Sequence, residues 1–307
     1  MKPPPFEHHA PRELGEALDV LARVGARGKV LAGGQSLIPM LNMRLAAPEH
    51  LVDINRVASL ATVEAGPLGV TVGALARDTQ VERARAHPLL TRALRLVAHP
   101  VIRNRGTVVG SLAHADPAAE LPAVLAVLGG SVRLARADRA TPTAGGGEVP
   151  NAAAGEGGVA VRDVGAAEFF VGPMESAVQP GELAVSAFFP ALPERSGTAF
   201  CEVARRHGDY ALAGVCAVVT LDEDFHLAEA RVACIGVGPV PLVVDVRELC
   251  GNRPSSGVAW AEVARAVQDR TEPEGDIHAS AAYRLHLVGV LAERALKEAV
   301  ADAMTGR

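Results

Sequence analysis

The stretch VLAGGQSLIPMLNM, residues 30–43, begins in a short apolar strand that we predict over residues 29–32 and that leads directly into Gly33 and Gly34. Glycine permits a tight turn and, having no Cβ atom, lets a ligand approach the backbone closely. Successive amide N–H groups in such a turn form a concave anion site, to which the Ser36 hydroxyl would add a donor. The pattern suits a diphosphate, although a plain tight turn would also place two glycines after a strand.

A second glycine-rich segment, RNRGTVVGSLAHADPAAELP, spans residues 103–122. It offers a turn with hydroxyl groups at Thr107 and Ser111, and Glu120 follows where its carboxylate could hold ribose or ribityl hydroxyls. Two such loops suit a long, bent ligand with a diphosphate in its middle. The alternative for Glu120 is ordinary charge placement at a helix N-terminus. Neither loop matches the dinucleotide fingerprint G-x-G-x-x-G or the triphosphate loop G-x-x-x-x-G-K-[ST].

The rest of the chain predicts a mixture of helices and strands in successive units. Helices are expected at residues 11–24, 79–98 with a break near 87–88, 116–128, 259–269 and 277–300. Strands are expected at residues 50–54, 61–74 as a hairpin that turns at 66–67, 131–135, 199–204, 212–221 and 228–236, and a regular pattern returns at 159–164 and 168–171. Residues 101–114 are interpreted as a loop with a short strand, 138–158 as an extended, mobile surface excursion of a hairpin, and 190–197 as a linker.

Composition argues against several classes of protein. The net charge of −5 gives no reason to expect a nucleic-acid partner. No run of about 18 apolar residues could span a membrane, and no apolar run near the N-terminus could act as a signal peptide, so a cytoplasmic protein is expected. The four cysteines contain no C-x-x-C pair, which argues against an iron–sulfur cluster or a structural zinc site on this chain. We predict no metal ligands and no acid–base catalyst.

Several long segments resemble one known family in order and spacing. They are AGGQSLIPMLNMRLAAPEHLVDINRV (32–57), TVGALARDTQVE (71–82) and IRNRGTVVGSLAHADPAAELPAV (102–124). Two later segments, EFFVGPMESAVQPGELAVSAFFP (168–190) and VARRHGDYALAGVCAVV (203–219), resemble its later blocks. The family is the FAD-binding medium subunit of molybdenum hydroxylases, of the carbon monoxide dehydrogenase and xanthine dehydrogenase type.

This resemblance implies an α+β fold with a two-subdomain FAD-binding domain of the vanillyl-alcohol-oxidase (PCMH) type, followed by a C-terminal α+β domain. The expected divisions are residues 1–60 for the first subdomain, 61–190 for the second and 198–300 for the C-terminal domain. FAD would lie between the two subdomains.

The resemblance also implies which residues bind FAD. They lie in two diphosphate loops, at an acidic position and in the strand before Pro190, and they are Ala32, Gly33, Gly34, Gln35, Ser36, Leu37, Thr107, Gly110, Ser111, Glu120 and Ala184. The second loop is commonly Gly-Gly-Asn in the family, whereas this chain has Val109-Gly110-Ser111.

The implied function is that of an electron-transfer subunit. The expected partners are a small subunit with [2Fe–2S] clusters and a large subunit with the molybdenum cofactor, in a heterotrimer or its dimer. Electrons would pass from molybdenum through the clusters to FAD and on to a final acceptor. Two alternatives stay open from the sequence: a self-sufficient flavin-dependent oxidase or dehydrogenase, and a flavin-free scaffold subunit that has kept the fold.

Overall fold

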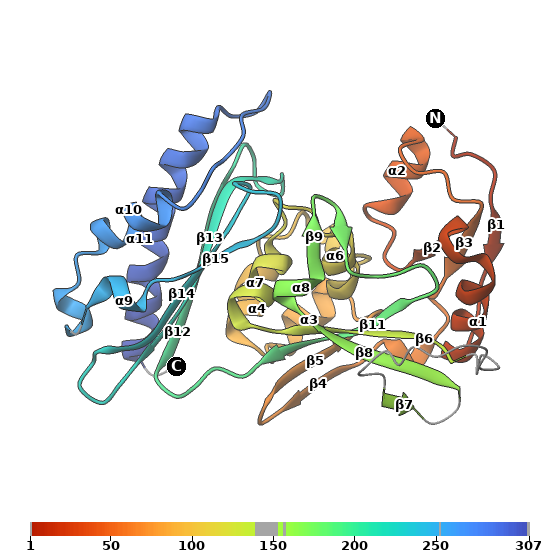
Figure 1. Cartoon of the computed structure of the whole chain (residues 1–307), viewed down its shortest axis with the longest axis horizontal. Coiled ribbons are helices and arrows are strands. Elements are labelled where there is room, and N and C mark those ends of the chain that lie inside the picture. The colour runs from red at the N-terminus through yellow and green to blue at the C-terminus, as the bar shows by residue number, and fades with distance from the viewer. Residues whose placement is uncertain (1, 139–152, 156–157, 252, 306–307) are drawn as a thin grey trace, which may run out of the picture.

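The computed structural model describes residues 2–138, 153–155, 158–251 and 253–305. Three larger sheets follow one another along the chain, with helices packed against them (Figure 1). No helix in these residues is both long and apolar enough to cross a bilayer.

The N-terminal unit is a parallel sheet of three strands in the order β1–β3–β2. Its strands and helices are β1 (Glu7–His9), α1 (Leu14–Val24), β2 (Gly28–Leu31), α2 (Leu37–Met43) and β3 (His50–Asp53), with short 3-10 turns at Gly25–Arg27 and Ala58–Leu60. Parallel strands need crossover connections: α2 joins the neighbouring strands β2 and β3, and α1 joins the two edge strands β1 and β2. Strand β1 was not predicted, because its three residues are all polar and lack the alternation of apolar and polar residues that indicates a strand. It is a strand only because it pairs with β3.

The second unit is built on a sheet of six strands in the order β4–β5–β11–β6–β8–β7. These strands are β4 (Val63–Gly66), β5 (Gly69–Gly73), β6 (Ser131–Ala137), β7 (Ala153–Gly155), β8 (Val159–Gly165) and β11 (Leu183–Pro190). Its helices are α3 (Asp78–Ala84), α4 (Pro88–Leu94), α5 (Pro100–Arg103), α6 (Val108–His114), α7 (Glu120–Leu128) and α8 (Ala166–Phe169), and a small hairpin joins β9 (Phe170–Gly172) to β10 (Glu175–Ser176). All strand pairs of the large sheet are antiparallel.

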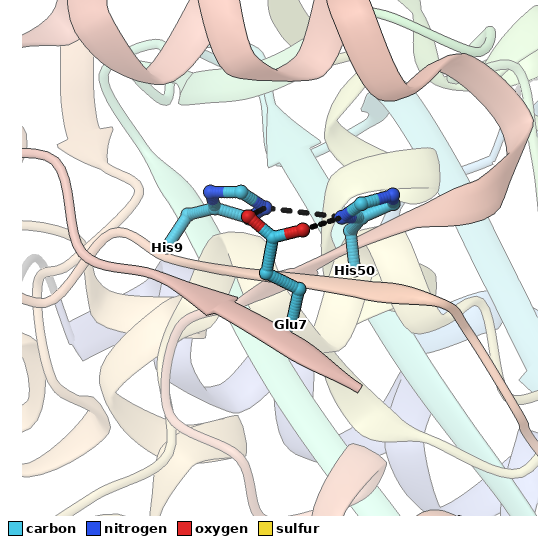
Figure 2. A group of neighbouring side chains, drawn as sticks. All are labelled: Glu7, His9 and His50. Carbon is cyan, nitrogen blue, oxygen red and sulfur yellow. Dashed lines mark hydrogen bonds and ion pairs between the residues drawn. The ribbon is translucent and has the colours of Figure 1, made fainter. Parts of the chain in front are cut away.

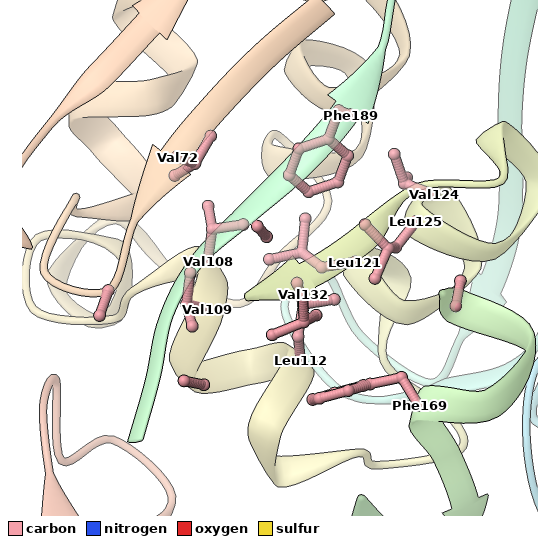
Figure 3. Close-up of a cluster of buried hydrophobic side chains, with 14 of the residues drawn as sticks. Val72, Val108, Val109, Leu112, Leu121, Val124, Leu125, Val132, Phe169 and Phe189 are labelled. Carbon is pink, nitrogen blue, oxygen red and sulfur yellow. The ribbon is translucent and has the colours of Figure 1, made fainter. Parts of the chain in front are cut away.

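A buried apolar core joins helices α6 and α7 to this sheet. Figure 3 shows the contributing side chains, among them Val108, Val109, Leu112, Leu121, Val124, Leu125, Val72, Val132, Phe169 and Phe189. Full burial of a valine, leucine or phenylalanine side chain stabilises a fold by about 1.5–3 kcal/mol. This core therefore fixes the place of the second glycine segment, which leads into α6.

The prediction of a loop and a short strand over residues 101–114 was wrong, because the segment forms helices α5 and α6. Pro100 occupies the first turn of α5, where its missing N–H is not needed. Thr107 caps α6, since its Oγ1 accepts the Gly110 N–H at 3.1 Å. Burial of Val108, Val109 and Leu112 on the core outweighs the weak helix propensity of valine and glycine.

The hairpin that was expected to carry a surface excursion is present. Strands β6 and β8 pair in antiparallel register, and β7 adds to the outer edge of β8. Most of the excursion predicted at 138–158 lies outside the described residues.

The C-terminal unit is an antiparallel sheet of four strands in chain order. It consists of β12 (Ser196–Ala204), β13 (Ala211–Leu221), β14 (Leu227–Ile235), β15 (Leu242–Asp245), α9 (Arg247–Cys250), a 3-10 turn (Ser255–Gly257), α10 (Trp260–Gln268) and α11 (Ala281–Thr305). Helix α11 covers one face, with α10 packed against α11, while α4 and α7 lie between the other face and the six-stranded sheet (Figure 1). Coverage on both faces explains why every residue of β13 is buried and why its sequence is continuously apolar.

Asp302 of α11 ties the C-terminal unit to the second unit. Its Oδ1 accepts from Arg92 Nη2 of α4 at 2.6 Å, and its Oδ2 accepts from the Thr198 N–H of β12 at 2.9 Å. We expect Asp302→Ala to lower the free energy of unfolding by about 1–2 kcal/mol in urea titrations, because two hydrogen bonds to one charged group are lost. Glu293→Ala, which removes a surface pair with Lys297 on the same helix, should cost under about 0.5 kcal/mol. Equal effects of the two substitutions would contradict this role for Asp302.

Candidate cofactor site

The two glycine segments are in direct contact. Gly33 is buried near the start of the first loop, and a Cβ atom added to it would lie 2.4 Å from the Arg105 carbonyl oxygen and 3.0 Å from Gly106 Cα. Carbon atoms do not approach backbone oxygens this closely, so only glycine fits at position 33. The first loop therefore packs onto the turn that leads into the second.

A network of side chains holds these two loops together. Arg77 donates from Nη1 to the Arg105 carbonyl at 2.7 Å and from Nη2 to Asn55 Oδ1 at 2.6 Å. Asn55 in turn donates from Nδ2 to the Ala32 carbonyl at 2.8 Å. Asp53 Oδ1 accepts from both the side chain and the backbone of Asn55, which fixes the orientation of the amide. One guanidinium thus links the second loop to the first through Asn55.

The first loop presents free backbone donors. Among the described residues, no protein group accepts from the amide N–H groups of residues 33–37. Gly34 has φ 76°, a left-handed conformation that favours glycine, and Ile38 donates its N–H to the Gly34 carbonyl at 3.0 Å to begin α2. A run of unused amides in a tight turn fits an anionic group such as a phosphate.

Positive charge lies beside this run of amides. Arg77 is flanked by Arg105, and burial together with that neighbouring charge lowers the pKa of Arg77. Guanidinium groups stay charged under all ordinary conditions, so Arg77 and Arg105 place positive charge near the loops, although Asp78 and Asp53 also lie close to Arg77.

Buried acids form the other part of the site. Asp78, at the start of α3, is 4% exposed, and its Oδ1 has no hydrogen-bond partner among the described residues. Burial raises the pKa of Asp78 to about 7, although Arg103 and Arg77 act in the opposite direction. Buried oxygens normally accept a hydrogen bond, and a hydroxyl-bearing ligand could donate one to this oxygen.

Glu120 lies within electrostatic range of a second, half-buried acid from the C-terminal unit. Burial, reinforced by the negative charge of Glu202 on β12, raises the pKa of Glu120 to about 8. Burial also raises the pKa of Glu202 to about 7, and Glu202 Oε2 has no partner in the described part of the chain. A carboxyl group with a pKa this high is substantially protonated near pH 7, so it can donate as well as accept hydrogen bonds.

The remaining residues predicted to bind FAD lie at the start of α6 and in β11. Thr107, Gly110 and Ser111 follow the contact point at the start of α6. Val109 is a buried helical residue, so its Cβ is accommodated by the core. Ala184 is buried in β11 opposite Leu134, and no described hydrogen bond joins it to either loop.

Sequence reasoning missed Asn55 and Arg77. Asn55 lies two residues beyond β3, and a polar residue directly after a buried strand is a weak signal for a site at the end of that strand. Arg77 gave no signal, because one arginine before a helix is common on a protein surface.

The raised pKa of Glu120 predicts how stability depends on pH. The folded-state value of about 8 lies above the unfolded value near 4.5, so the folded chain binds the extra proton between these limits. Stability should therefore fall as pH rises from about 5 to 8. Glu120→Gln should weaken this dependence of stability on pH and raise the free energy of unfolding at pH 8 by on the order of 1 kcal/mol. Urea titrations at pH 5.5 and pH 8 give the free energy of unfolding at each pH, with exposed Glu64→Gln as the control. The prediction is refuted if this free energy changes equally between the two pH values in the wild type, Glu120→Gln and Glu64→Gln.

Two family models match most of the chain. The model described as the FAD binding domain in molybdopterin dehydrogenase matches residues 4–144, and the CO dehydrogenase flavoprotein C-terminal domain matches residues 198–299. The two matches fall on either side of the segment that connects the second unit to the C-terminal unit.

Individual relatives match over nearly their full length. The 6-hydroxypseudooxynicotine dehydrogenase complex subunit alpha of Paenarthrobacter nicotinovorans is 37% identical over 98% of this chain and 96% of its own. The carbon monoxide dehydrogenase medium chain of Hydrogenophaga pseudoflava is 34% identical over 97% and 98%.

Solved structures agree with these matches. A chain of quinoline 2-oxidoreductase from Pseudomonas putida 86 superposes with a TM-score of 0.86 at 31% identity, covering 99% of this chain and 100% of that one. A chain of the Hydrogenophaga pseudoflava carbon monoxide dehydrogenase gives a TM-score of 0.85 at 32% identity, covering 98% and 99%. The α+β architecture expected from the sequence is thereby confirmed.

Proposed function

This chain belongs to the family of FAD-binding medium subunits of molybdenum hydroxylases, of the carbon monoxide dehydrogenase and xanthine dehydrogenase type, and on that premise we propose that its two touching glycine loops bind the diphosphate of FAD. The chain is the FAD-binding electron-transfer subunit of a heteromeric molybdenum hydroxylase, and so one component of an oxidoreductase. The observation that carries the loop assignment is the contact of Gly33 with Arg105 and Gly106 beside a run of unused amides.

In this proposal the first loop supplies backbone donors and the second adds hydroxyl groups. The first loop comprises Ala32, Gly33, Gly34, Gln35, Ser36 and Leu37, and the second contributes Thr107, Gly110 and Ser111. The Thr107 hydroxyl already accepts from Gly110, which leaves its hydrogen to donate to a ligand oxygen. Amide donors, hydroxyl donors and nearby guanidinium charge together neutralise a diphosphate without any metal ligand from this chain.

Glu120 is proposed to hold a hydroxyl or carbonyl group of the cofactor. Its raised pKa keeps the carboxyl protonated near neutral pH, so it can donate to one ligand oxygen and accept from another. Ala184 is proposed to line the flavin position, which is supported by its place in β11, the strand against which α6 packs. When bound, FAD supplies the conversion between one-electron and two-electron transfer, while the protein binds and orients it.

We further propose that the partner subunits are a small subunit with [2Fe–2S] clusters and a large subunit with the molybdenum cofactor, joined as a heterotrimer or its dimer. The four cysteines of this chain support this division, because all are buried and unpaired with one another. Burial raises the pKa of each of these thiols, and their sequence spacing contains no C-x-x-C pair of the kind that iron–sulfur sites commonly use. The proposed divisions of the chain remain 1–60, 61–190 and 198–300.

The test is a visible spectrum of the protein purified with the subunits that accompany it, followed by denaturation and identification of the released chromophore. We expect about one FAD per chain together with iron–sulfur absorbance from two further subunits. A colourless chain that also fails to take up added FAD would overturn the loop assignment and favour a scaffold. Substrate turnover by the isolated yellow chain would instead favour a self-sufficient flavoenzyme.

A further inference from the structure

Three potential metal ligands converge on one face of the N-terminal sheet, away from the cofactor loops. Glu7 and His9 are alternate residues of β1 and therefore point to the same face. Strand β3 pairs with β1 in parallel register, which places His50 opposite Glu7. Figure 2 shows the Glu7 carboxylate between the two imidazole rings.

The distances between the ligand atoms match those around a tetrahedral zinc ion. His9 Nε2 lies 3.1 Å from His50 Nδ1. Glu7 Oε1 lies 3.6 Å from His9 Nε2, and the other carboxylate oxygen, Oε2, lies 3.4 Å from His50 Nδ1. Zinc bonds of about 2.0–2.2 Å at tetrahedral angles separate neighbouring ligand atoms by about 3.3–3.6 Å. One ligand atom from each of the three residues lies within 4.8 Å of the other two, so rotations of the side chains could bring all three onto one ion.

The surroundings of the three groups suit a partly open site. The side chains of His9 and His50 are 13% and 16% exposed, whereas that of Glu7 is 65% exposed. The sheet thus holds the imidazoles in place, while the carboxylate side faces solvent, from which water can supply a fourth ligand. Two imidazoles with one carboxylate is a donor set that zinc uses widely.

We propose that Glu7, His9 and His50 form a binding site for a divalent cation of the zinc class. The bound ion would join β1 to β3, adding to a pairing that otherwise depends on a three-residue strand. Strand β3 leads into Asp53 and Asn55, so the ion would stabilise the sheet whose end supports the first glycine loop. The alternative is a simple hydrogen bond between two neutral histidines with a nearby carboxylate, which needs no ion.

Zinc titration of the full chain, first treated with a chelator and dialysed, tests the proposal. Competition with a chromophoric zinc chelator gives affinity and stoichiometry, and thermal melts with and without zinc give the stabilisation. We expect one site per chain and a higher melting temperature with zinc. His9→Ala and His50→Ala should each weaken zinc binding by more than about tenfold, since even loss of groups that only orient a ligand costs this much.

His8→Ala is the matched control, because His8 lies between two ligands but points to the opposite face of β1 and contacts Asp53 at 3.4 Å. It should leave zinc affinity unchanged. Glu7→Gln changes an exposed side chain, so the variant should still fold. Weaker zinc binding by Glu7→Gln would therefore support the site even if His9→Ala or His50→Ala misfolds. The proposal is overturned if the wild-type protein binds no zinc, or if the variants of Glu7, His9 and His50 bind zinc as well as the wild type. Either result would favour an ion-free hydrogen bond between the two histidines.

Discussion

Gly33→Ala should abolish FAD retention by the purified chain and lower its affinity for FAD at least about 100-fold, close to 3 kcal/mol. The added Cβ would lie 2.4 Å from the Arg105 carbonyl oxygen, and this neighbour is backbone that cannot rotate away. The two loops must therefore separate, which displaces the amides of residues 33–37 from the hydroxyl groups of the second loop. Overpacking of this kind typically also costs about 1–3 kcal/mol in stability.

The measurement is a fluorescence titration of the deflavinated full chain with FAD, paired with urea unfolding. Gly15→Ala is the control, because a Cβ at this exposed helical position meets no atom within 4 Å. It should leave FAD binding unchanged and stabilise the chain by about 0.5–1 kcal/mol. If Gly33→Ala binds FAD like the wild type, the contact between the loops does not shape the site.

Arg77→Ala should lower FAD affinity about 10–100-fold, because hydrogen bonds from a charged donor contribute about 1.5–3 kcal/mol. The substitution removes the donors to the Arg105 carbonyl and to Asn55, so the second loop is no longer tied to the carbonyl of Ala32. Arg77→Lys should recover only part of the loss, since a single ammonium group cannot reproduce the planar fork that reaches both acceptors. Arg77 acts here as a positioning residue.

A double-mutant cycle with Asn55→Ala separates positioning from a general loss of stability. Residues in one hydrogen-bond network are not additive, so the double variant should bind FAD little worse than either single variant. Arg133→Ala serves as the control, because its paired contacts with Asp163 lie on the surface of the sheet. Surface pairs contribute about 0–1 kcal/mol, so FAD affinity should stay within about twofold of the wild type. Additive losses for Arg77 and Asn55 would argue against a shared network.

The order of the elements and the position of the glycine loops could be predicted from the chain itself. Apolar periodicity gave α1, α7, α10 and α11, and the continuous apolar run of residues 212–221 predicted β13. A Gly-Gly pair directly after a strand located the first loop, because turn formation there depends on neighbouring residues only. The same local patterns supported the family resemblance, which relatives along nearly the whole chain confirm.

Local pattern failed where tertiary contacts outweighed propensity. Residues 101–114 are rich in valine and glycine, yet they form α5 and α6 because the core between α6, α7 and the sheet buries the apolar face. Strand β1 exists because β3 offers it a partner, and its sequence alone would not predict a strand.

The sequence by itself determined the strand-and-loop framework, the succession of units and the family, since each depends on residues close together in the chain. The tertiary structure alone decided that Gly33 touches Arg105, that Arg77 joins Asn55 to the second loop, and that the charge of Glu202 in the C-terminal unit helps to raise the pKa of Glu120. It also brought His9 within hydrogen-bonding distance of His50. The physical reason is that hydrogen bonding, packing and the pKa of a buried acid depend on distance in space, and the partners in each case lie far apart in the chain.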